Sequence, residues 1–285
     1  MNKSACGMAA GFVCLLAGLA VAGDPVVADG GLTTGVPKGM VVIPAGINSG
    51  KDPDFGAYAL TNRTAFAMDA TEVTKARWDD VRIWGATHGY TDLPAGGSKG
   101  TNHPVVTVSW YDCVKWCNAR SEKEGRTPCY TDGGGICRTG GPSPTCTFTA
   151  NGYRLPTNTE WEYAARGGVS GKRFPWGDTI DHTRANYKGN PSGNAYDQGY
   201  EGFDTRYATE GSPYTSPAGA FAANGYGLYD MAGNAWEWCW DASEVNRLHR
   251  GGCWSYDAGP ARCGRRDYTF EGAENHILGF RAVCR

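Results

Sequence analysis

The stretch Asn224–Trp240, NGYGLYDMAGNAWEWCW, decides how the rest of the chain is organised. Its tryptophans stand at alternate positions, Trp236, Trp238 and Trp240. This spacing predicts a strand with one large aromatic face, because successive side chains of a strand point to opposite sides. Aromatic side chains bury a large area each, so we expect this strand in the core.

Polar residues crowd into the turn that precedes this strand. Asp230, Gly233, Asn234 and Glu237 lie within one short segment and place side-chain and backbone oxygens around a tight Gly-Asn turn. Calcium takes about six to eight such oxygens in a flexible cage. The turn is therefore a candidate calcium site. The alternative from the residues alone is an ordinary turn with solvated polar groups.

Composition and charge narrow the class of protein. The chain has 285 residues, a length that suits one large domain or two small ones. Its 42 glycines are about twice the usual share, which favours tight turns and ordered loops. The formal net charge is -2, so nothing in the charge points to nucleic acid or an anionic membrane surface.

The N-terminus has the plan of a secretory signal peptide. Lys3 precedes an apolar run over residues 8–21, and small residues follow at the cleavage site. The run is short for a membrane span, although an uncleaved anchor is the alternative. We expect residues 1–22 to be removed, 23–38 to be a linker and 39–285 to form one domain. The mature protein is then secreted or periplasmic, without a membrane span.

Cysteines are numerous for an exported chain. Of the 11 in the sequence, Cys6 and Cys14 lie in the expected signal peptide. The remaining thiols can form disulfides outside the cytoplasm, and their odd number leaves at least one unpaired or paired between chains. The expected pairs are Cys137 with Cys146, Cys117 with Cys129, and Cys239 with Cys263.

Several elements can be placed by pattern. Met40–Pro44 predicts a strand, and Thr71–Trp84 has apolar residues at helical spacing. Ser109 and Thr157 each precede an acidic residue by three positions, so we expect a helix with a capping box at each. Residues 174–221 show no strong periodicity. That is long for a loop in a compact domain, unless a bound ion holds it.

The run Asn224–Trp238 resembles the signature of the formylglycine-generating enzyme family, also called sulfatase-modifying factors. Other pieces that resemble this family follow in order along residues 39–285. The resemblance implies a single α+β domain with a C-type-lectin-like core and many irregular loops. The pieces are Gly39–Gly46, Thr71–Thr74, His103–Trp110, Gly152–Thr157, Glu160–Gly168, Phe174–Gly177, Arg250–Gly252 and Leu278–Arg281.

The resemblance also implies two calcium sites, one of which coincides with the polar turn. Each acid involved has the alternative of being a solvated loop carboxylate. Exchange of Glu237 for Gln is expected to lower thermal stability only when calcium is present. The implied ligands are Asn186, the Tyr187 carbonyl and Glu210, with Asp204 as the alternative acid, at the first site, and Asp230, the carbonyls of Gly233 and Ala235, and Glu237 at the second.

Copper is not expected. The best-known members of the family use copper, held by two cysteines, and oxygen to turn a substrate cysteine into formylglycine. Those positions fall on Tyr256 and near Ala261, and Ile277 replaces a pocket Asn, so the resemblance implies lost copper chemistry. The candidate pocket residues are Trp236, Cys253, Tyr256, Cys263 and Arg266.

Three functions remain open at this point. The first is a calcium-stabilised binding or assembly module whose altered pocket holds a peptide or a small acidic ligand. The second is an oxidoreductase acting on thiols, in which Cys253 and Cys263 bind copper or form a redox pair, with a plain disulfide or buried thiols as the ordinary alternatives. The third is carbohydrate binding, which rests on analogy of fold alone.

Overall fold

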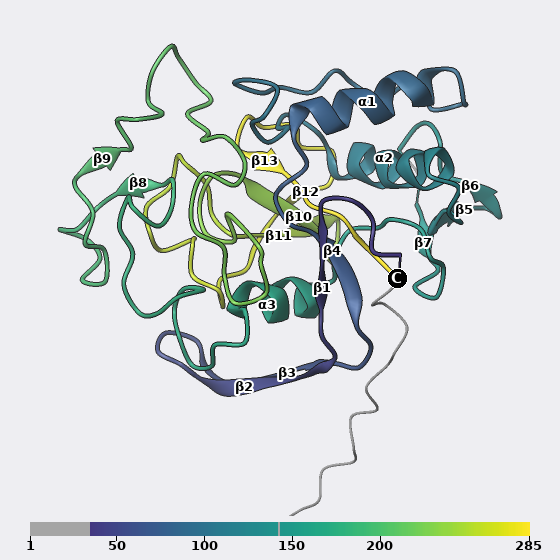
Figure 1. The fold of residues 1–285 in the computed structure, drawn as a ribbon. Helices are drawn as coiled ribbons and strands as arrows, with labels where there is room; N and C mark the ends of the chain where they lie inside the picture. The colour runs from purple at the N-terminus through teal and green to yellow at the C-terminus, as the bar shows by residue number, and fades with distance from the viewer. Residues whose placement is uncertain (1–34, 142) are drawn as a thin grey trace, which may run out of the picture.

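The structure, a computed structural model, describes residues 35–141 and 143–285, so the expected signal peptide and most of the expected linker lie outside the described residues (Figure 1). In the described ranges no helix is both long and apolar enough to cross a membrane. The helices are α1 (Lys75–Ala86), α2 (Trp110–Lys123) and α3 (Asn158–Arg166). The strands are β1 (Met40–Ile43), β2 (Gly46–Asp52), β3 (Gly56–Asn62), β4 (Phe66–Asp69), β5 (Tyr130–Asp132), β6 (Gly135–Ile136), β7 (Thr145–Cys146), β8 (Lys188–Gly189), β9 (Gly202–Phe203), β10 (Trp236–Ser243), β11 (Asn246–Arg250), β12 (Asp267–Phe270), β13 (Leu278–Gly279) and β14 (Val283–Cys284).

The tryptophan strand is confirmed as β10, at the centre of the molecule (Figure 1). It belongs to a four-stranded sheet of order β12-β11-β10-β13. It pairs antiparallel with β11, with Glu237 opposite Arg250, and parallel with β13, with Trp236 opposite Leu278. Trp238 is fully buried, as a strand with an aromatic face requires.

A second sheet, of order β1-β4-β14, joins the two ends of the domain. Strand β4 lies in its middle and is buried throughout, so it is covered on both faces. Asp69 at its end accepts two hydrogen bonds from the buried guanidinium of Arg120, at 2.9 and 3.0 Å, and one from the Ala282 amide. The last residues of the chain are thereby fixed against the first strands.

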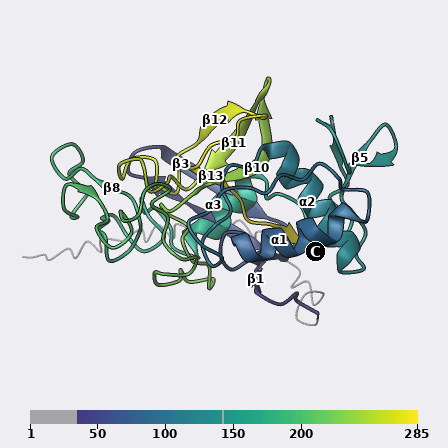
Figure 2. The ribbon, with the colours of Figure 1, turned by 90° about the horizontal axis from the view of Figure 1, so that it is seen from above.

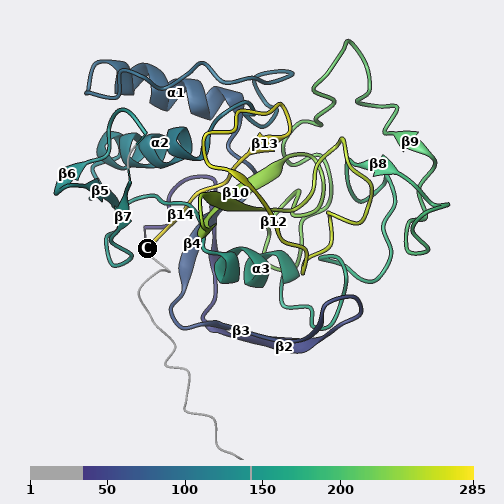
Figure 3. The same ribbon diagram turned by 180° about the vertical axis from the view of Figure 1, so that it is seen from behind.

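Helices α1 and α2 lie side by side over one end of these sheets (Figures 1 and 3). Their contact includes the parallel rings of Trp78 and Trp116, 5.9 Å apart. Both predicted capping boxes are present, with Ser109 preceding α2 and Thr157 preceding α3. Helix α1 starts later than predicted, at Lys75, because Thr74 is its N-cap with extended backbone and the Val73 amide and carbonyl are bonded to Phe280 and Val105 instead of within a helix.

The β2–β3 hairpin runs along the outer side of α3 (Figures 1 and 3). Its register runs from Gly46 opposite Asn62 to Asp52 opposite Gly56. The guanidinium of Arg166, from α3, lies 3.9 Å from the centre of the Tyr58 ring. The hairpin is thus attached to the helix by charged and aromatic contacts.

Residues 174–221 contain only the two-residue strands β8 and β9, in agreement with the missing periodicity (Figure 2). Buried carboxylates hold this segment in place. Asp197 accepts hydrogen bonds from the backbone amides of Asn190 and Gly199, at 2.7 and 2.9 Å. Asp204 is 2% exposed and is paired with Arg206. Side-chain oxygens therefore supply part of the anchoring that the sequence assigns to an ion.

The predicted disulfides are not formed, and the nine cysteines that the structure describes are free thiols. Strand β5 lies between β6 and β7, so Cys137, just after β6, is on the opposite side of β5 from Cys146. This strand order separates the two cysteines of the first expected pair. The other two expected pairs are not bonded either: Cys117 and Cys129 belong to one core cluster, and Cys239 and Cys263 belong to another.

Candidate functional site

The turn that leads into β10 has unusual backbone geometry. Asp230, Gly233 and Asn234 have φ of 56°, 84° and 65°. A Cβ at Gly233 would lie 2.3 Å from the carbonyl oxygen of Asn186, so only glycine fits there. Non-glycine residues in this region cost about 1–3 kcal/mol each and concentrate at functional sites. The turn is therefore a candidate site on backbone grounds alone.

Asn234 ties this turn to three other segments. Its backbone amide donates to the Asn186 carbonyl at 2.7 Å. Its side chain accepts from the Ser216 amide at 2.8 Å and donates to Glu72 Oε1 at 2.9 Å. Glu72 is consequently brought beside the turn, although it lies far away in sequence.

Three buried carboxylates, Glu72, Asp230 and Glu237, surround this point, with Arg281 as their cation. Glu237 and Arg281 form two hydrogen bonds of 2.8 and 2.7 Å, and the Trp161 indole donates to Glu237 at 2.7 Å. By contrast, Glu72 Oε2 and Asp230 Oδ1 are buried without a hydrogen-bond partner among the described residues. Buried acceptors of this kind are rare and call for a ligand, a proton or an ion.

The electrostatics of the cluster follow from this imbalance. Burial raises the pKa of Glu72 well above its usual value; the Asp230 and Glu237 charges add to this, and Arg281 opposes it. Burial also raises the pKa of Asp230 to about 6, despite the Gly219 amide and Arg281, which act in the other direction. Three carboxylates face one guanidinium, so the cluster needs protons or a divalent cation to be neutral.

The donor set fits calcium better than a transition metal. In the described ranges no three His, Cys, Asp or Glu side chains are arranged to hold a metal by themselves. Calcium accepts backbone carbonyls beside carboxylates, and Gly233 and Ala235 flank Asn234 in the turn. Sequence reasoning missed Glu72 as a site residue. The sequence signal that could have pointed to Glu72 is the family motif Thr71–Thr74, which contains it.

The residues expected at a first calcium site are placed as follows. Asn186 is buried, and its side chain donates to the Tyr214 carbonyl at 2.8 Å. The Tyr187 carbonyl oxygen lies 3.2 Å from His182 Nε2. Glu210 is exposed, whereas Asp204 is buried against Arg206. Neither acid hydrogen-bonds to Asn186 or Tyr187 in the part of the chain described.

An aromatic cavity of about 380 Å³ lies beside β10. Trp236, His249, Asp267 and Leu278 line it, so all four strands of the central sheet contribute. Burial lowers the pKa of His249 to about 4, with Asp267 opposing the shift, and the ring is therefore neutral near pH 7. The cavity presents aromatic faces, a neutral imidazole and a charged rim.

Only two of the predicted pocket residues line this cavity, Trp236 and the half-exposed Tyr256, with ring centres 6.3 Å apart. Cys253 and Cys263 are buried in different parts of the core, and burial raises the pKa of each thiol to about 12. Arg266 lines a separate cavity. The structure adds residues that the sequence reasoning missed, namely His249, Arg265, Asp267 and Tyr268.

Fold and site together define a mixed α+β domain with few helices, short strands and long ordered loops around a central aromatic strand. Residues 32–285 match the model of the sulfatase-modifying factor enzyme 1-like domain. The chain belongs to this family, and both the family and the fold predicted from the sequence are confirmed.

Individual relatives agree with this assignment. The chain is 33% identical over 251 residues to the chaperone protein LppX of Paenibacillus barcinonensis, covering 82% of this chain and 85% of the relative. It is 32% identical over 256 residues to the formylglycine-generating enzyme of Thermomonospora curvata, covering 72% of each. The solved structure of CarF superposes with a TM-score of 0.66 and 26% identity, covering 87% of this chain and 98% of that one.

Proposed function

We propose that this chain is an exported binding or assembly module of the formylglycine-generating enzyme family, stabilised by calcium and without the family's copper chemistry. The observation that carries the proposal is that Glu72 Oε2 and Asp230 Oδ1, beside the turn that leads into β10, are buried and have no hydrogen-bond partner among the described residues. A calcium ion would supply the counter-charge that these oxygens lack, and the aromatic cavity beside β10 is the proposed binding surface.

Calcium balances the charge of the carboxylate cluster. Glu72, Asp230 and Glu237 carry three negative charges against the one positive charge of Arg281, so one divalent cation makes the group neutral. Among the residues that the structure describes, Glu237 Oε1 accepts a single hydrogen bond, from Arg281, and so has a lone pair for the proposed ion. The proposed ligands are Glu72, Asp230, Glu237 and the carbonyls of Gly233 and Ala235.

A further calcium ion at Asn186, the Tyr187 carbonyl and Glu210 is the second part of this proposal. Binding there requires the exposed Glu210 to turn inward, or the buried Asp204 to exchange its partner Arg206 for the ion. Calcium is therefore expected to bind more weakly at this first site than at the second site, which contains Asp230 and Glu237.

Copper chemistry is not supported by the residues at the aligned positions. Tyr256 offers a phenol and Ala261 a methyl group, whereas Cu(I) takes soft thiolates. No cysteine lines the aromatic cavity among the described residues. The rim instead holds Arg265, joined to Asp267 by hydrogen bonds of 2.8 and 2.9 Å. This arrangement suits a peptide or small ligand with an apolar group, and the name of the LppX relative, a chaperone, supports a binding role.

The calcium proposal is tested by metal analysis of the protein secreted from an expressing host. We expect bound calcium that resists dialysis, no stoichiometric copper, and an N-terminus after Ala22. Asp230→Asn should lose one equivalent of calcium, while Asp80→Asn, whose side chain is 68% exposed, serves as the matched control and should lose none. Protein that neither retains calcium nor is stabilised by it would refute the proposal.

An oxidoreductase acting on thiols is the second candidate, favoured by the similarity to the formylglycine-generating enzyme of Thermomonospora curvata. Incubation with copper, oxygen and a cysteine-containing sulfatase peptide tests it. Mass spectrometry that shows the aldehyde product, lost in Cys253→Ser, would replace the binding proposal by this one. The third candidate is sugar binding. A glycan-binding screen in the presence of calcium that detects no bound glycan would exclude it.

A further inference from the structure

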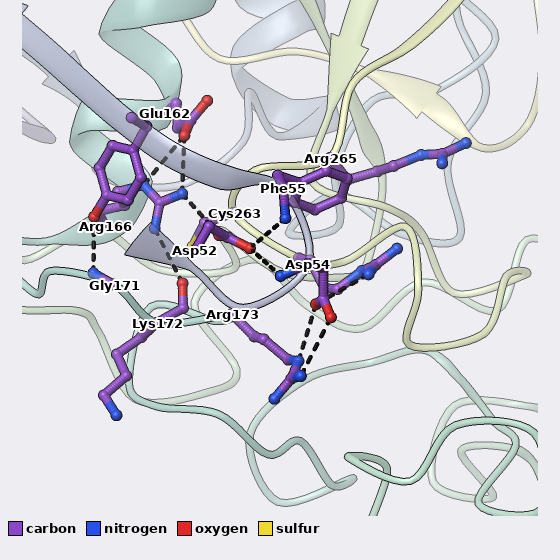
Figure 4. A network of polar contacts seen from close by, with 12 residues as sticks. Asp52, Asp54, Phe55, Glu162, Arg166, Gly171, Lys172, Arg173, Cys263 and Arg265 are labelled. Atoms are coloured by element: carbon purple, nitrogen blue, oxygen red, sulfur yellow. Dashed lines mark hydrogen bonds and ion pairs between the residues drawn. The ribbon is translucent and has the colours of Figure 1, made fainter. Parts of the chain in front are cut away.

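A second cavity, of about 420 Å³, lies between the β2–β3 hairpin and α3, and Arg265 is the residue that it shares with the lining of the aromatic cavity. Figure 4 shows the polar network around it. Its walls include Phe55 and Tyr58 from the hairpin and Arg166 from α3. Arg265 and Arg266, from the loop just before β12, complete them. We propose that this cavity binds a small monoanion, a carboxylate attached to an aromatic or aliphatic body.

The floor of the cavity is a built network of buried charges. Arg166 donates to Asp52 at 3.0 Å and to Glu162 at 2.9 and 3.2 Å, as Figure 4 shows. All three side chains are at most 3% exposed. Arg250 donates to the second oxygen of Glu162 at 2.6 Å. The acids of the floor are thus already satisfied by guanidinium groups and do not require a ligand.

The mouth, by contrast, has a cation without a hydrogen-bonded partner. The Arg266 side chain is 50% exposed, and Glu162 Oε2, its nearest carboxylate oxygen, lies 3.6 Å away. That oxygen is the one bound by Arg250. In the part of the chain described, Arg266 donates no hydrogen bond with its side chain, so its planar fork remains available for an oxyanion.

The charge balance selects a monoanion. The lining has two carboxylates, Asp52 and Glu162, and three guanidiniums, those of Arg166, Arg265 and Arg266. Arg250 behind Glu162 and Asp267 beside Arg265 add one charge of each sign. One positive charge is left over within the lining and its direct ion-pair partners, and the neighbouring group of Asp54, Arg173 and Arg262 is also positive. A carboxylate neutralises it, whereas a dianion would leave a negative charge next to Asp52 and Glu162.

The wall beside the guanidinium mouth is aromatic, and the Arg262 guanidinium, paired with Asp54, lies 4.7 Å from the centre of the Phe55 ring. Phe55 is 44% exposed at the hairpin tip, which is brought against the loop because Gly264 has no Cβ; one would lie 2.6 Å from the Phe55 ring. The Tyr58 ring is covered on one face by Arg166. A ligand with its carboxylate at Arg266 would therefore place its apolar body against Phe55.

Benzoate is the probe, and benzamide is its neutral counterpart. Isothermal titration calorimetry on the whole mature protein at low salt should show binding of benzoate and at least tenfold weaker binding of benzamide. Arg266→Gln should weaken benzoate by roughly tenfold, since a charge-assisted bond is lost. Phe55→Ala should weaken both compounds. Arg63→Gln, at an exposed position outside the cavity, is the matched control and should change neither.

Three results obtained with the unmodified protein would overturn the proposal. They are an absence of benzoate binding at millimolar concentration, equal binding of benzoate and benzamide, and tighter binding of phenyl phosphate than of benzoate. Tyr256→Ala separates this site from the aromatic cavity. Benzoate binding that is lost in Tyr256→Ala but kept in Arg266→Gln would assign the ligand to the other cavity and refute the site proposed here.

Discussion

Glu237 shows how one residue can serve both the fold and an ion site. Its carboxylate is held by the fully buried Arg281 through two hydrogen bonds and by the Trp161 indole. The ion pair fixes the carboxylate in the core before any calcium is considered. A substitution at Glu237 therefore changes stability mainly through the ion pair with Arg281, and only in addition through calcium.

Glu237→Gln is accordingly expected to destabilise the protein with and without calcium, by about 1.5–3 kcal/mol, because a neutral amide replaces the carboxylate that holds the buried Arg281 through two charge-assisted hydrogen bonds. From the sequence alone we expect a loss only when calcium is present, and the geometry of the pair changes that expectation. Urea unfolding in EGTA and in calcium measures both cases. A variant as stable as the wild type in EGTA would contradict the role of the pair.

Asp230→Asn is the cleaner probe of the ion. Asparagine tolerates the positive φ of this position, and the change removes one of three crowded carboxylates. We expect the calcium-free variant to be at least as stable as the wild type at neutral pH, and the stabilisation by calcium to disappear. Thermal unfolding of the wild type and of Asp230→Asn at several calcium concentrations measures this stabilisation. An unchanged calcium response would place the ion elsewhere.

At the scale of elements, the helices depend on local signals that act within a few residues. The Ser109 hydroxyl accepts from the Asp112 amide at 3.2 Å, and the Asp112 carboxylate accepts from the Ser109 amide at 3.0 Å. Ser109→Ala should therefore cost about 1 kcal/mol of unfolding free energy. Ser143→Ala, at an exposed position, is the control. Equal unfolding midpoints for the two variants would show that the cap contributes nothing.

The same locality explains what could be predicted from the sequence. Capping boxes and the alternating tryptophans are short-range patterns, and the structure contains them. The β2–β3 hairpin could not be predicted because three of its buried positions are polar, Asn48, Asp52 and Asn62. These residues are satisfied by hydrogen bonds, as Asn62 is by the Pro44 carbonyl at 2.8 Å. Burial of bonded polar groups removes the apolar alternation by which a strand is detected.

The candidate sites depend on contacts between distant segments, and that limits what a sequence reveals. Asp230 and Glu237 were visible because they share one turn. Glu72 is brought to them by a hydrogen bond from Asn234, which lies 162 positions away in the chain. Arg266 was visible as a pocket residue by resemblance, yet it lines another cavity, because the hairpin that forms that cavity was not predicted.

At the scale of the whole molecule, the buried acids couple stability to pH. The pKa of Asp230 rises from an ordinary 3.8 to about 6 on folding, and that of Glu72 shifts in the same direction. Between these pH values the folded state binds more protons than the unfolded state. Stability without calcium must then fall as pH rises from about 4 to above 6. For Asp230 alone the loss approaches about 3 kcal/mol.

Calcium should reverse this loss, because it neutralises the carboxylates in place of protons. We expect added calcium to raise the unfolding free energy strongly at pH 8 and little at pH 5, where protons already occupy the cluster. His249 acts in the opposite direction, since its pKa of about 4 makes stability fall as pH drops below 6.5. The difference between wild type and Asp230→Asn, measured by urea unfolding across this range, removes the histidine contribution because both proteins share it. A difference that does not vary with pH, or a calcium effect as large at pH 5 as at pH 8, would mean that the carboxylates of this cluster are not the groups that calcium binds.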